Sequence, residues 1–378
     1  MLAVRLTALL PLLLADPTID DLVAAAGSRS RTDRTVVVAP GARPAVLAAM
    51  ALGARGVARA TGDAAPAGAD GGTPLLVVTA TGRQAEETAA ALTCYLPATD
   101  VAVFPAWETL PHERLSPRAD TVATRLSVLR RLAHPEDGRA GAPVSSGAPD
   151  PVSSGAPDPV SSGVPDPVSS GVPDPQRGPI RVLVVPVRAL LAPVVDGLGE
   201  LEPVHLAKGL EVGLEATAER LAAAAYTRVD MVENRGEFAV RGGILDVFPP
   251  TLARPVRVDF FGDEIESVST FAVADQRTIE EVDAVTATAC REIVLTDAVR
   301  ERARALTDVI PGAADMLGKI AEGINCEGME SLAPVLVERM VPLLDLVGDR
   351  LVVGLEPERL RKRAEDLVAT TAEFLAAA

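Results

Sequence analysis

Arginines and carboxylates are interspersed along one stretch in the second half of the chain, and these side chains are the best suited to chemistry. From Tyr226 to Phe261 there are five of each, namely Arg228, Arg235, Arg241, Arg254 and Arg257 with Asp230, Glu233, Glu237, Asp246 and Asp259. A guanidinium group makes forked hydrogen bonds to carboxylates, and arginine is enriched at protein interfaces. The pattern therefore indicates either a surface that binds another protein or a solvated sheet face with weak ion pairs.

Residues that could bind a metal ion or act as a nucleophile are scattered. The three cysteines are Cys94, Cys290 and Cys326, without a Cys-x-x-Cys pair, and the three histidines are His112, His134 and His205. Neither a zinc site nor a disulfide framework is indicated, which suits the cytoplasm. We therefore expect no catalytic residue, no metal and no cofactor in this chain.

A phosphate-binding loop would fall between Val36 and Met50, where a strand, a turn and a helix are expected in succession. Such a loop needs glycines, a lysine for the phosphates and a serine or threonine for magnesium. Residues 39–44 read APGARP, with one glycine and two prolines that lack a backbone N–H. Arg43 could contact a phosphate, but the loop as a whole does not favour nucleotide binding.

Composition limits the classes of function. The 378 residues carry a net charge of −16 and are 48% hydrophobic but only 3% aromatic. That is enough apolar material for two or three domains, but an acidic chain is poorly suited to general binding of the DNA backbone. The first 17 residues are similar to a signal peptide, yet the apolar run is short and ends at Asp16. We expect an amphipathic first helix there and no membrane segment.

Strands separated by glycine and proline are expected around the arginines. Residues 235–266 read RGEFAVRGGILDVFPPTLARPVRVDFFGDEIE, in which apolar and polar residues alternate between Gly-Gly, Pro-Pro and Gly-Asp turns. This pattern predicts an antiparallel meander of about four strands with one apolar face. The other face would carry Arg235, Glu237, Arg241, Arg257 and Asp259.

The rest of the chain contains short apolar segments that alternate with helical patterns. The expected strands are 35–39, 75–79, 101–104, 180–185 and 351–353. Continuous apolar strands alternating with helices predict a parallel sheet covered on both faces. We therefore expect an α/β fold, in which a small α+β domain with an antiparallel sheet is inserted into a parallel-sheet core.

A helix is expected after Ser116-Pro117, because serine at the N-cap followed by proline is a typical helix start. Val122, Leu126, Leu129 and Leu132 fall on one face of this helix. Arg118, Arg125 and Arg131 lie largely off that face, so we expect them to be solvated.

Four copies of an eight-residue repeat, PVSSGAPD twice and PVSSGVPD twice, occupy residues 143–174. This composition cannot bury a core, which predicts a disordered spacer. The expected organisation is a first part of the core at 1–135, the repeat insertion at 136–179, a core strand and helix at 180–197, the inserted α+β domain at 198–291 and a mostly helical return to the core at 292–378.

Several blocks of the chain resemble the transcription-repair-coupling factor family. They are RGEFAVRGGILDVFP and DFFGDEIE within 235–266, WETLPHERLSPRADTVATRL at 107–126 and LVVGLEPERLRKRAEDL at 351–367. The resemblance covers nearly everything except the repeats. More distantly, the inserted domain resembles the matching domain of the excision-repair helicase UvrB. The resemblance implies a degenerate helicase-like core, of the UvrB domain 1 type, that has lost its phosphate-binding loop.

In that family the inserted domain docks onto the damage sensor UvrA. The resemblance therefore implies an N-terminal module that recruits UvrA to stalled RNA polymerase in transcription-coupled nucleotide excision repair. Family members continue into a polymerase-binding domain and an ATP-dependent motor on double-stranded DNA, so we expect a fragment or a truncated gene product without enzyme activity. Two alternatives stay open, namely a separate UvrA-binding competitor and a UvrB-like nucleotide-dependent repair enzyme.

The UvrB-like pattern also implies which residues contact UvrA. Its arginines on the exposed sheet face correspond to Arg228 and Arg241, whereas a further arginine of UvrB is replaced here by Ala239. Arg235 and Phe238 are expected as flanking contacts.

Overall fold

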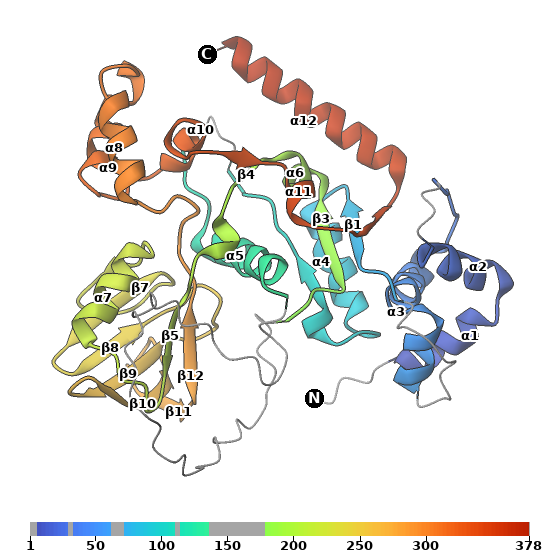
Figure 1. Ribbon diagram of the computed structural model, residues 1–378, viewed down its shortest axis with the longest axis horizontal. Helices are drawn as coiled ribbons and strands as arrows, with labels where there is room; N and C mark the ends of the chain where they lie inside the picture. Colours follow the sequence, from blue (N-terminus) through green and yellow to red (C-terminus); the bar gives the residue numbers. More distant parts are fainter. Residues whose placement is uncertain (1–5, 29–32, 62–71, 110–113, 136–177, 378) are drawn as a thin grey trace, which may run out of the picture.

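The computed structural model describes residues 6–28, 33–61, 72–109, 114–135 and 178–377. The octapeptide repeats, and the predicted insertion up to residue 177, lie outside the described residues. Figure 1 shows two units: a helix-covered sheet built from both ends of the chain, and a smaller, mainly β unit built from residues between them.

A four-stranded parallel sheet forms the centre of the larger unit. Its order is β14 (Leu351–Gly354), β1 (Leu75–Thr79), β3 (Val182–Pro186) and β2 (Val101–Val103). Both β1 and β3 are buried along their whole length, as expected for apolar strands with helices on both sides. The predicted parallel core is confirmed, and its edge strand β14 comes from the C-terminal part of the chain.

Alternate residues of these strands face two separate hydrophobic cores. Leu75 and Val77 pack on one side of the sheet, whereas Leu76 and Val78 pack on the other. The first core is covered by α1 (Leu10–Leu14), α2 (Pro17–Ala26), α3 (Arg43–Thr61) and α4 (Gly82–Leu92). The second is covered by α5 (Ala119–Ala133), α6 (Val187–Leu191), α11 (Leu343–Leu346) and α12 (Pro357–Ala377).

The predicted strand at 35–39 is not formed. This segment has no strand pairing, and Val37 is 98% exposed. The neighbours of β1 in the sheet are β14 and β3, so β1 has no free edge to offer. An apolar segment becomes a strand only when a partner edge satisfies its backbone groups. Here the place next to β1 is taken by a strand from the far end of the chain.

The smaller unit contains a six-stranded sheet in the order β11-β10-β9-β8-β7-β6. Its strands are β6 (Thr227–Arg228), β7 (Glu237–Arg241), β8 (Ile244–Val247), β9 (Val256–Phe261), β10 (Glu264–Phe271) and β11 (Thr278–Glu281). Neighbours from β7 to β11 are antiparallel, and β6 runs parallel to β7. The predicted meander is therefore confirmed, with one further strand at each edge.

Helix α7 (Leu214–Ala223) and a two-stranded ribbon complete the smaller unit. The ribbon pairs β5 (Val204–Ala207) with β12 (Ala284–Ala287), which are its first and last strands. Leu221 of α7 and Leu206 of β5 share one core with Phe238, Leu245 and Val258 of the large sheet. Because β5 and β12 pair, the chain enters and leaves this unit at the same place.

After the smaller unit the chain returns to the larger one through helices. The helices α8 (Asp297–Leu306), α9 (Ala314–Ala321) and α10 (Ala333–Leu336) share a core of their own. Strand β13 (Met340–Val341) then pairs with β4 (Val194–Val195) before β14 joins the parallel sheet. In Figure 1 the last helix, α12, extends beyond the body of the molecule. None of the helices that the structure describes is long and apolar enough to cross a bilayer.

The prediction that Ser116 caps α5 was wrong. The helix begins at Ala119, with Arg118 at its N-cap and no side-chain hydrogen bond there. The hydroxyl of Ser116 instead donates to Glu330 Oε2 at 2.7 Å and accepts from the backbone N–H of Gly328 at 2.9 Å. The segment at Gly328 and Glu330, distant in sequence, thus binds the hydroxyl that was expected to cap α5.

The prediction of solvated arginines on α5 was also wrong for two of them. Arg125 and Arg131 are buried. Arg125 forms an ion pair with the buried carboxylate of Glu292, and Arg131 Nε donates to the carbonyl of Gly178 at 3.0 Å. Both partners are remote in sequence, so the local helical pattern could not reveal them.

Candidate protein-docking site

Two glycine turns fix the outer face of the six-stranded sheet, which is the face turned away from α7. Gly242 and Gly262 occupy the first central position of two-residue hairpin turns, with φ of 61° and 64°. Glycine adopts this conformation without steric cost, and it is typical of type II′ turns. The resulting register pairs Arg241 with Ile244, and Ile244 with Asp259. These three side chains therefore lie in one row on the outer face.

A buried carboxylate lies in the middle of the outer face. Asp246 is 1% exposed, and its neighbours across the sheet are Ala239 and Arg257. Arg257 donates from Nε to Oδ1 at 2.7 Å and from Nη2 to Oδ2 at 2.9 Å. Arg241 donates from Nη2 to Oδ2 at 2.9 Å. Asp246 thus accepts three charge-assisted hydrogen bonds, two of them from Arg257.

Arg257 is a structural part of this face. Its guanidinium lies over the ring of Phe271, 4.8 Å from the ring centre, and its Nη1 donates to the carbonyl of Gln276 at 3.2 Å. The hydrogen bond to Asp246 raises the pKa of Arg257. Phe271 also belongs to a small core with Val232, Ala239 and Phe248 on this side of the sheet, so Arg257 is held by packing as well as by charge.

Arg241 differs from Arg257 because half of its side chain reaches solvent, with an exposed fraction of 51%. Ile244 is also exposed, and Phe261 is 78% exposed. Phe261 follows Asp259 by two positions in β9, so both side chains project from the outer face. A restrained arginine beside an exposed aromatic ring and an aliphatic side chain is typical of a surface that binds another protein.

Ile244 and Phe261 were not predicted as binding residues. The signal was present for Phe261, because it shares the polar register of Arg257 and Asp259, while its neighbour Phe260 lies on the apolar register. A large apolar residue at a polar position of a half-buried strand is a candidate contact residue.

Residues 204–292 match the UvrB interaction domain family. Across 381 aligned positions the chain is 43% identical to the transcription-repair-coupling factors of Mycobacterium tuberculosis and Mycobacterium bovis, covering 98% of this chain and 26% of each relative. With the factor of Escherichia coli K12 the identity is 29% over 243 positions, covering 63% of this chain and 17% of the relative.

The chain is a relative of the transcription-repair-coupling factors.

The chain spans about a quarter of the length of these two mycobacterial relatives, at 26%. The UvrB interaction domain match contains β5, α7, β12 and the complete six-stranded sheet. The outer face therefore belongs to this domain. The mixed α/β architecture agrees with the UvrB-like fold that the sequence resemblance implies.

Arg228 lies on β6, at the edge of the UvrB interaction domain. It is exposed, and it pairs with Phe238 in the register of β6 and β7. Arg228 shares the side of its partner Phe238. Phe238 and Arg241 are three positions apart on β7 and point to opposite sides, so Arg228 lies on the side opposite to Arg241. The structure therefore does not bring the two predicted contact arginines together on one face.

The turn before β7 holds the predicted contact Arg235. Glu237 accepts backbone N–H bonds from Glu233 at 2.8 Å and from Asn234 at 2.7 Å. Burial alone would raise the pKa of Glu237, but its hydrogen bonds with Asn234 and Glu233 together lower it. Arg235 is exposed, and its Nε donates to the carbonyl of Leu252 at 3.0 Å.

The prediction that Phe238 contacts a partner was wrong. Its side chain is buried and packs with Leu245 and Val258 in the core of the UvrB interaction domain. Strand alternation turns Phe238 toward α7 and Ala239 toward the outer face. Phe238 thus supports the strand that carries Arg241 from behind.

The predicted degenerate phosphate loop lies outside the UvrB interaction domain. Pro40–Ala42 forms a short 3-10 turn, η2, at the start of α3. The guanidinium of Arg43 donates from Nη1 to Glu356 Oε1 at 2.9 Å. Hydrogen bonds from Arg43 and Arg359 lower the pKa of Glu356. The arginine that could have contacted a phosphate is therefore paired with a carboxylate.

Cysteine and histidine side chains form no centre in the part of the chain that the structure describes. No group of three or more histidine, cysteine, aspartate or glutamate residues there is arranged to hold a metal ion. Cys94 is exposed, Cys326 is half-buried and Cys290 is buried in the UvrB interaction domain, and none forms a disulfide. Burial raises the pKa of the Cys290 thiol to about 12.

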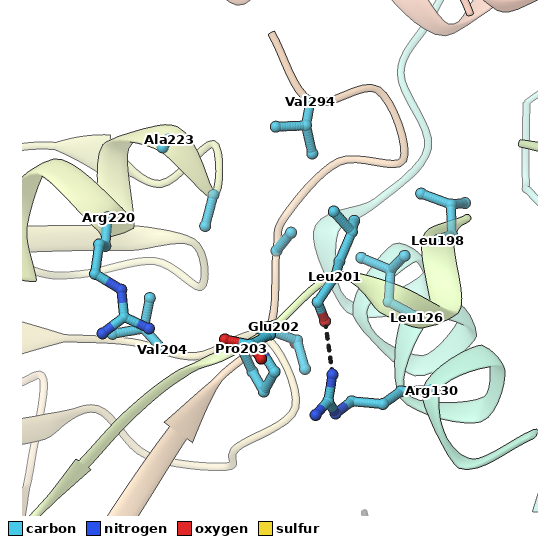
Figure 2. A pocket seen from close by; sticks show the side chains of 13 residues that line it. Leu126, Arg130, Leu198, Leu201, Glu202, Pro203, Val204, Arg220, Ala223 and Val294 are labelled. Atoms are coloured by element: carbon cyan, nitrogen blue, oxygen red, sulfur yellow. Dashed lines mark hydrogen bonds between the residues drawn. The ribbon is translucent and has the colours of Figure 1, made fainter. Parts of the chain in front are cut away.

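A cleft of about 230 Å³ lies where the UvrB interaction domain meets the larger unit. Figure 2 shows Arg220 of α7 on one side of the chain connection and Arg130 of α5 on the other. Arg130 Nη1 donates to the carbonyl of Leu201 at 3.2 Å, and most of the remaining lining is apolar. The cleft lies on the α7 side of the sheet, so it is separate from the outer face.

Proposed function

We propose that this chain docks onto the damage sensor UvrA through its UvrB interaction domain and thereby acts in transcription-coupled nucleotide excision repair. The observation that carries the proposal is the outer face, where Asp246 holds the half-exposed guanidinium of Arg241. The relatives are named for the coupling of transcription to repair, and the matched family is named for an interaction domain. We propose residues 198–291 as the docking unit and the remaining residues as its host.

Arg241 is the central contact in this proposal. Arg228 lies on the opposite side of the sheet but at its edge strand β6, so in this proposal UvrA contacts it around that edge. Arg235 contributes from the turn before β7. Ala239 occupies the position of a further UvrB arginine. Here it is buried with Phe248 in the small core on the outer side of the sheet. The contact with UvrA must therefore differ from that of UvrB at this position.

We assign polymerase binding and ATP-driven movement on double-stranded DNA to parts of the relatives that this chain does not span. Residues 39–44 lack the lysine and hydroxyl side chain of a phosphate-binding loop, and Arg43 is engaged by Glu356. The net charge of −16 also disfavours direct binding to the DNA backbone. The proposed role is therefore recruitment of a protein partner.

Isothermal titration calorimetry of the chain with UvrA from the same organism tests this proposal. The wild type should bind, and Arg241→Ala should weaken binding by about 2 kcal/mol, or roughly 30-fold. Arg228→Ala/Arg241→Ala should lose more, while the melting temperature stays unchanged because both side chains are exposed. Arg83→Ala, on an exposed part of α4, is the matched control and should bind like the wild type.

The two ways in which this experiment can fail have different meanings. Wild-type affinity in the double variant would refute the assignment of the docking site. A folded wild-type chain that does not bind UvrA would refute the proposed function itself.

A further inference from the structure

Asp246 is bound by two arginines, and one of them is enough to neutralise it. Arg257 makes a forked pair with both carboxylate oxygens and is itself fixed by Phe271. Forked pairs of this kind are the strongest arrangement of an arginine with a carboxylate. The further bond from Arg241 is therefore not required to compensate the buried charge of Asp246.

The bond between Asp246 and Arg241 instead restrains Arg241. A long side chain that is half exposed would otherwise sample several rotamers, and ordering it on binding costs free energy. Among the described residues, Asp246 engages only Nη2 of Arg241, and the side chain of Arg241 is 51% exposed. Arg241 is thus held in one place while most of its donors stay available.

The geometry points to Asp246 as a positioning residue for docking, which holds Arg241 ready for a carboxylate on the partner. This inference rests on the proposed function and deepens it. Ile244 lies in the same row as Arg241, and Phe261 projects from the same face beyond Asp259. The partner surface that fits is acidic opposite Arg241 and has an apolar recess for the ring of Phe261.

Titration of UvrA with Asp246→Asn tests the positioning role, because asparagine keeps the shape of the side chain but loses its charge. We expect binding to weaken about tenfold. In the Arg241→Ala background the same substitution should cause no further loss, because Asp246 acts through Arg241. Asp283→Asn, an exposed aspartate in the turn between β11 and β12, is the matched control and should bind normally. Phe261→Ala should also weaken binding about tenfold without lowering the melting temperature.

Side-chain NMR keeps the test decisive if Asp246→Asn fails to fold or if UvrA does not bind. The Nε–H order parameter of Arg241 in the free wild-type chain should be clearly higher than that of Arg228. Equal mobility of the two side chains would overturn the positioning role. So would wild-type affinity in folded Asp246→Asn, or an additional loss in the Arg241→Ala background. Absence of binding by the wild type would refute the proposed function but not the restraint, which the order parameter reports alone.

Discussion

Glu292, at the end of the UvrB interaction domain, and Arg125, in the middle of α5, form a buried ion pair across the boundary between the two units. Trp107 Nε1 donates to Glu292 Oε1 at 2.9 Å, and Arg125 Nη1 donates to the carbonyl of Pro105 at 2.9 Å. The guanidinium of Arg125 also lies 4.1 Å from the centre of the Phe104 ring. The ion pair thus joins the UvrB interaction domain to the larger unit, and both charged groups have further polar or aromatic partners.

Removal of one member of this pair should strongly destabilise the chain. Glu292→Ala leaves the charge of Arg125 buried without its carboxylate, for which a loss of about 3–5 kcal/mol is expected. Urea unfolding followed by far-UV circular dichroism measures the change. Glu358→Ala is the control, because its ion pair with Arg361 is exposed and should contribute less than about 1 kcal/mol.

Replacement of both members should be milder than replacement of one. Arg125→Met/Glu292→Leu removes both charges and fills the site with apolar atoms, which is often neutral or stabilising for buried pairs. A double variant less stable than Glu292→Ala would contradict this account.

Trp107 should report on the boundary between the units. It is the single tryptophan of the sequence, and its indole N–H is bound to Glu292. If the pair fastens the two units together, tryptophan emission and circular dichroism should change in one urea transition. An earlier transition seen only by fluorescence would show that the domain separates before the host unfolds.

The strands of both sheets could be predicted largely from the sequence, because apolar runs and glycine turns are local signals. The edge strands β6 and β11 were not predicted, and the strand predicted at 35–39 was wrong, since its pattern is that of a strand but the edge it would need is occupied by β14. No local pattern reveals which strand takes a given place in a parallel sheet.

The site could be predicted only in part. The family resemblance pointed to Arg228, Arg235 and Arg241, and the structure places all three at the surface. It could not show that Asp246 is buried between two arginines, because that depends on the register of three strands. Phe238 was misplaced for a different reason, because the family resemblance was followed although the alternation of residues 235–241 already puts Phe238 on the apolar face.

The turn before β7 should weaken at acid pH. The pKa of Glu237 is lowered in the folded chain, so its contribution to stability is present above the unfolded pKa and is lost as pH falls through the folded value. The stability difference between the wild type and Glu237→Gln should therefore be largest near pH 7 and shrink below about pH 4. This stability difference should stay below about 1 kcal/mol, because the carboxylate of Glu237 is largely solvated. Thermal melts at several pH values measure it, and a difference that grows toward acid pH would argue against this role.

The cysteines should react with iodoacetamide in the order of their burial. Cys94 is exposed and should be alkylated first, whereas the pKa of Cys290 is raised to about 12 by burial. At pH 8 the thiolate fraction of Cys290 is then on the order of a thousandfold below that of a free cysteine. Mass spectrometry of native and urea-unfolded chain should show alkylation of Cys290 only after unfolding.

The same thiol should make stability depend on alkaline pH. Because the folded pKa of Cys290 exceeds the unfolded value, its contribution is complete below about pH 8.5 and declines as pH rises above it. Cys290→Ala should lose less stability than the wild type between pH 8 and pH 10. Parallel decline of the two chains over this range would speak against the raised pKa.

The order of the strands along the chain also has a consequence for synthesis on the ribosome. The UvrB interaction domain is complete once residue 292 has emerged, but the sheet that hosts it lacks β14 until residue 354 has been made. At 5–20 residues per second this interval lasts roughly 3–12 seconds, during which the edge of β1 remains open. A nascent chain therefore carries a finished UvrB interaction domain beside an unfinished parallel sheet, and the hazard of wrong edge pairing is greatest during translation.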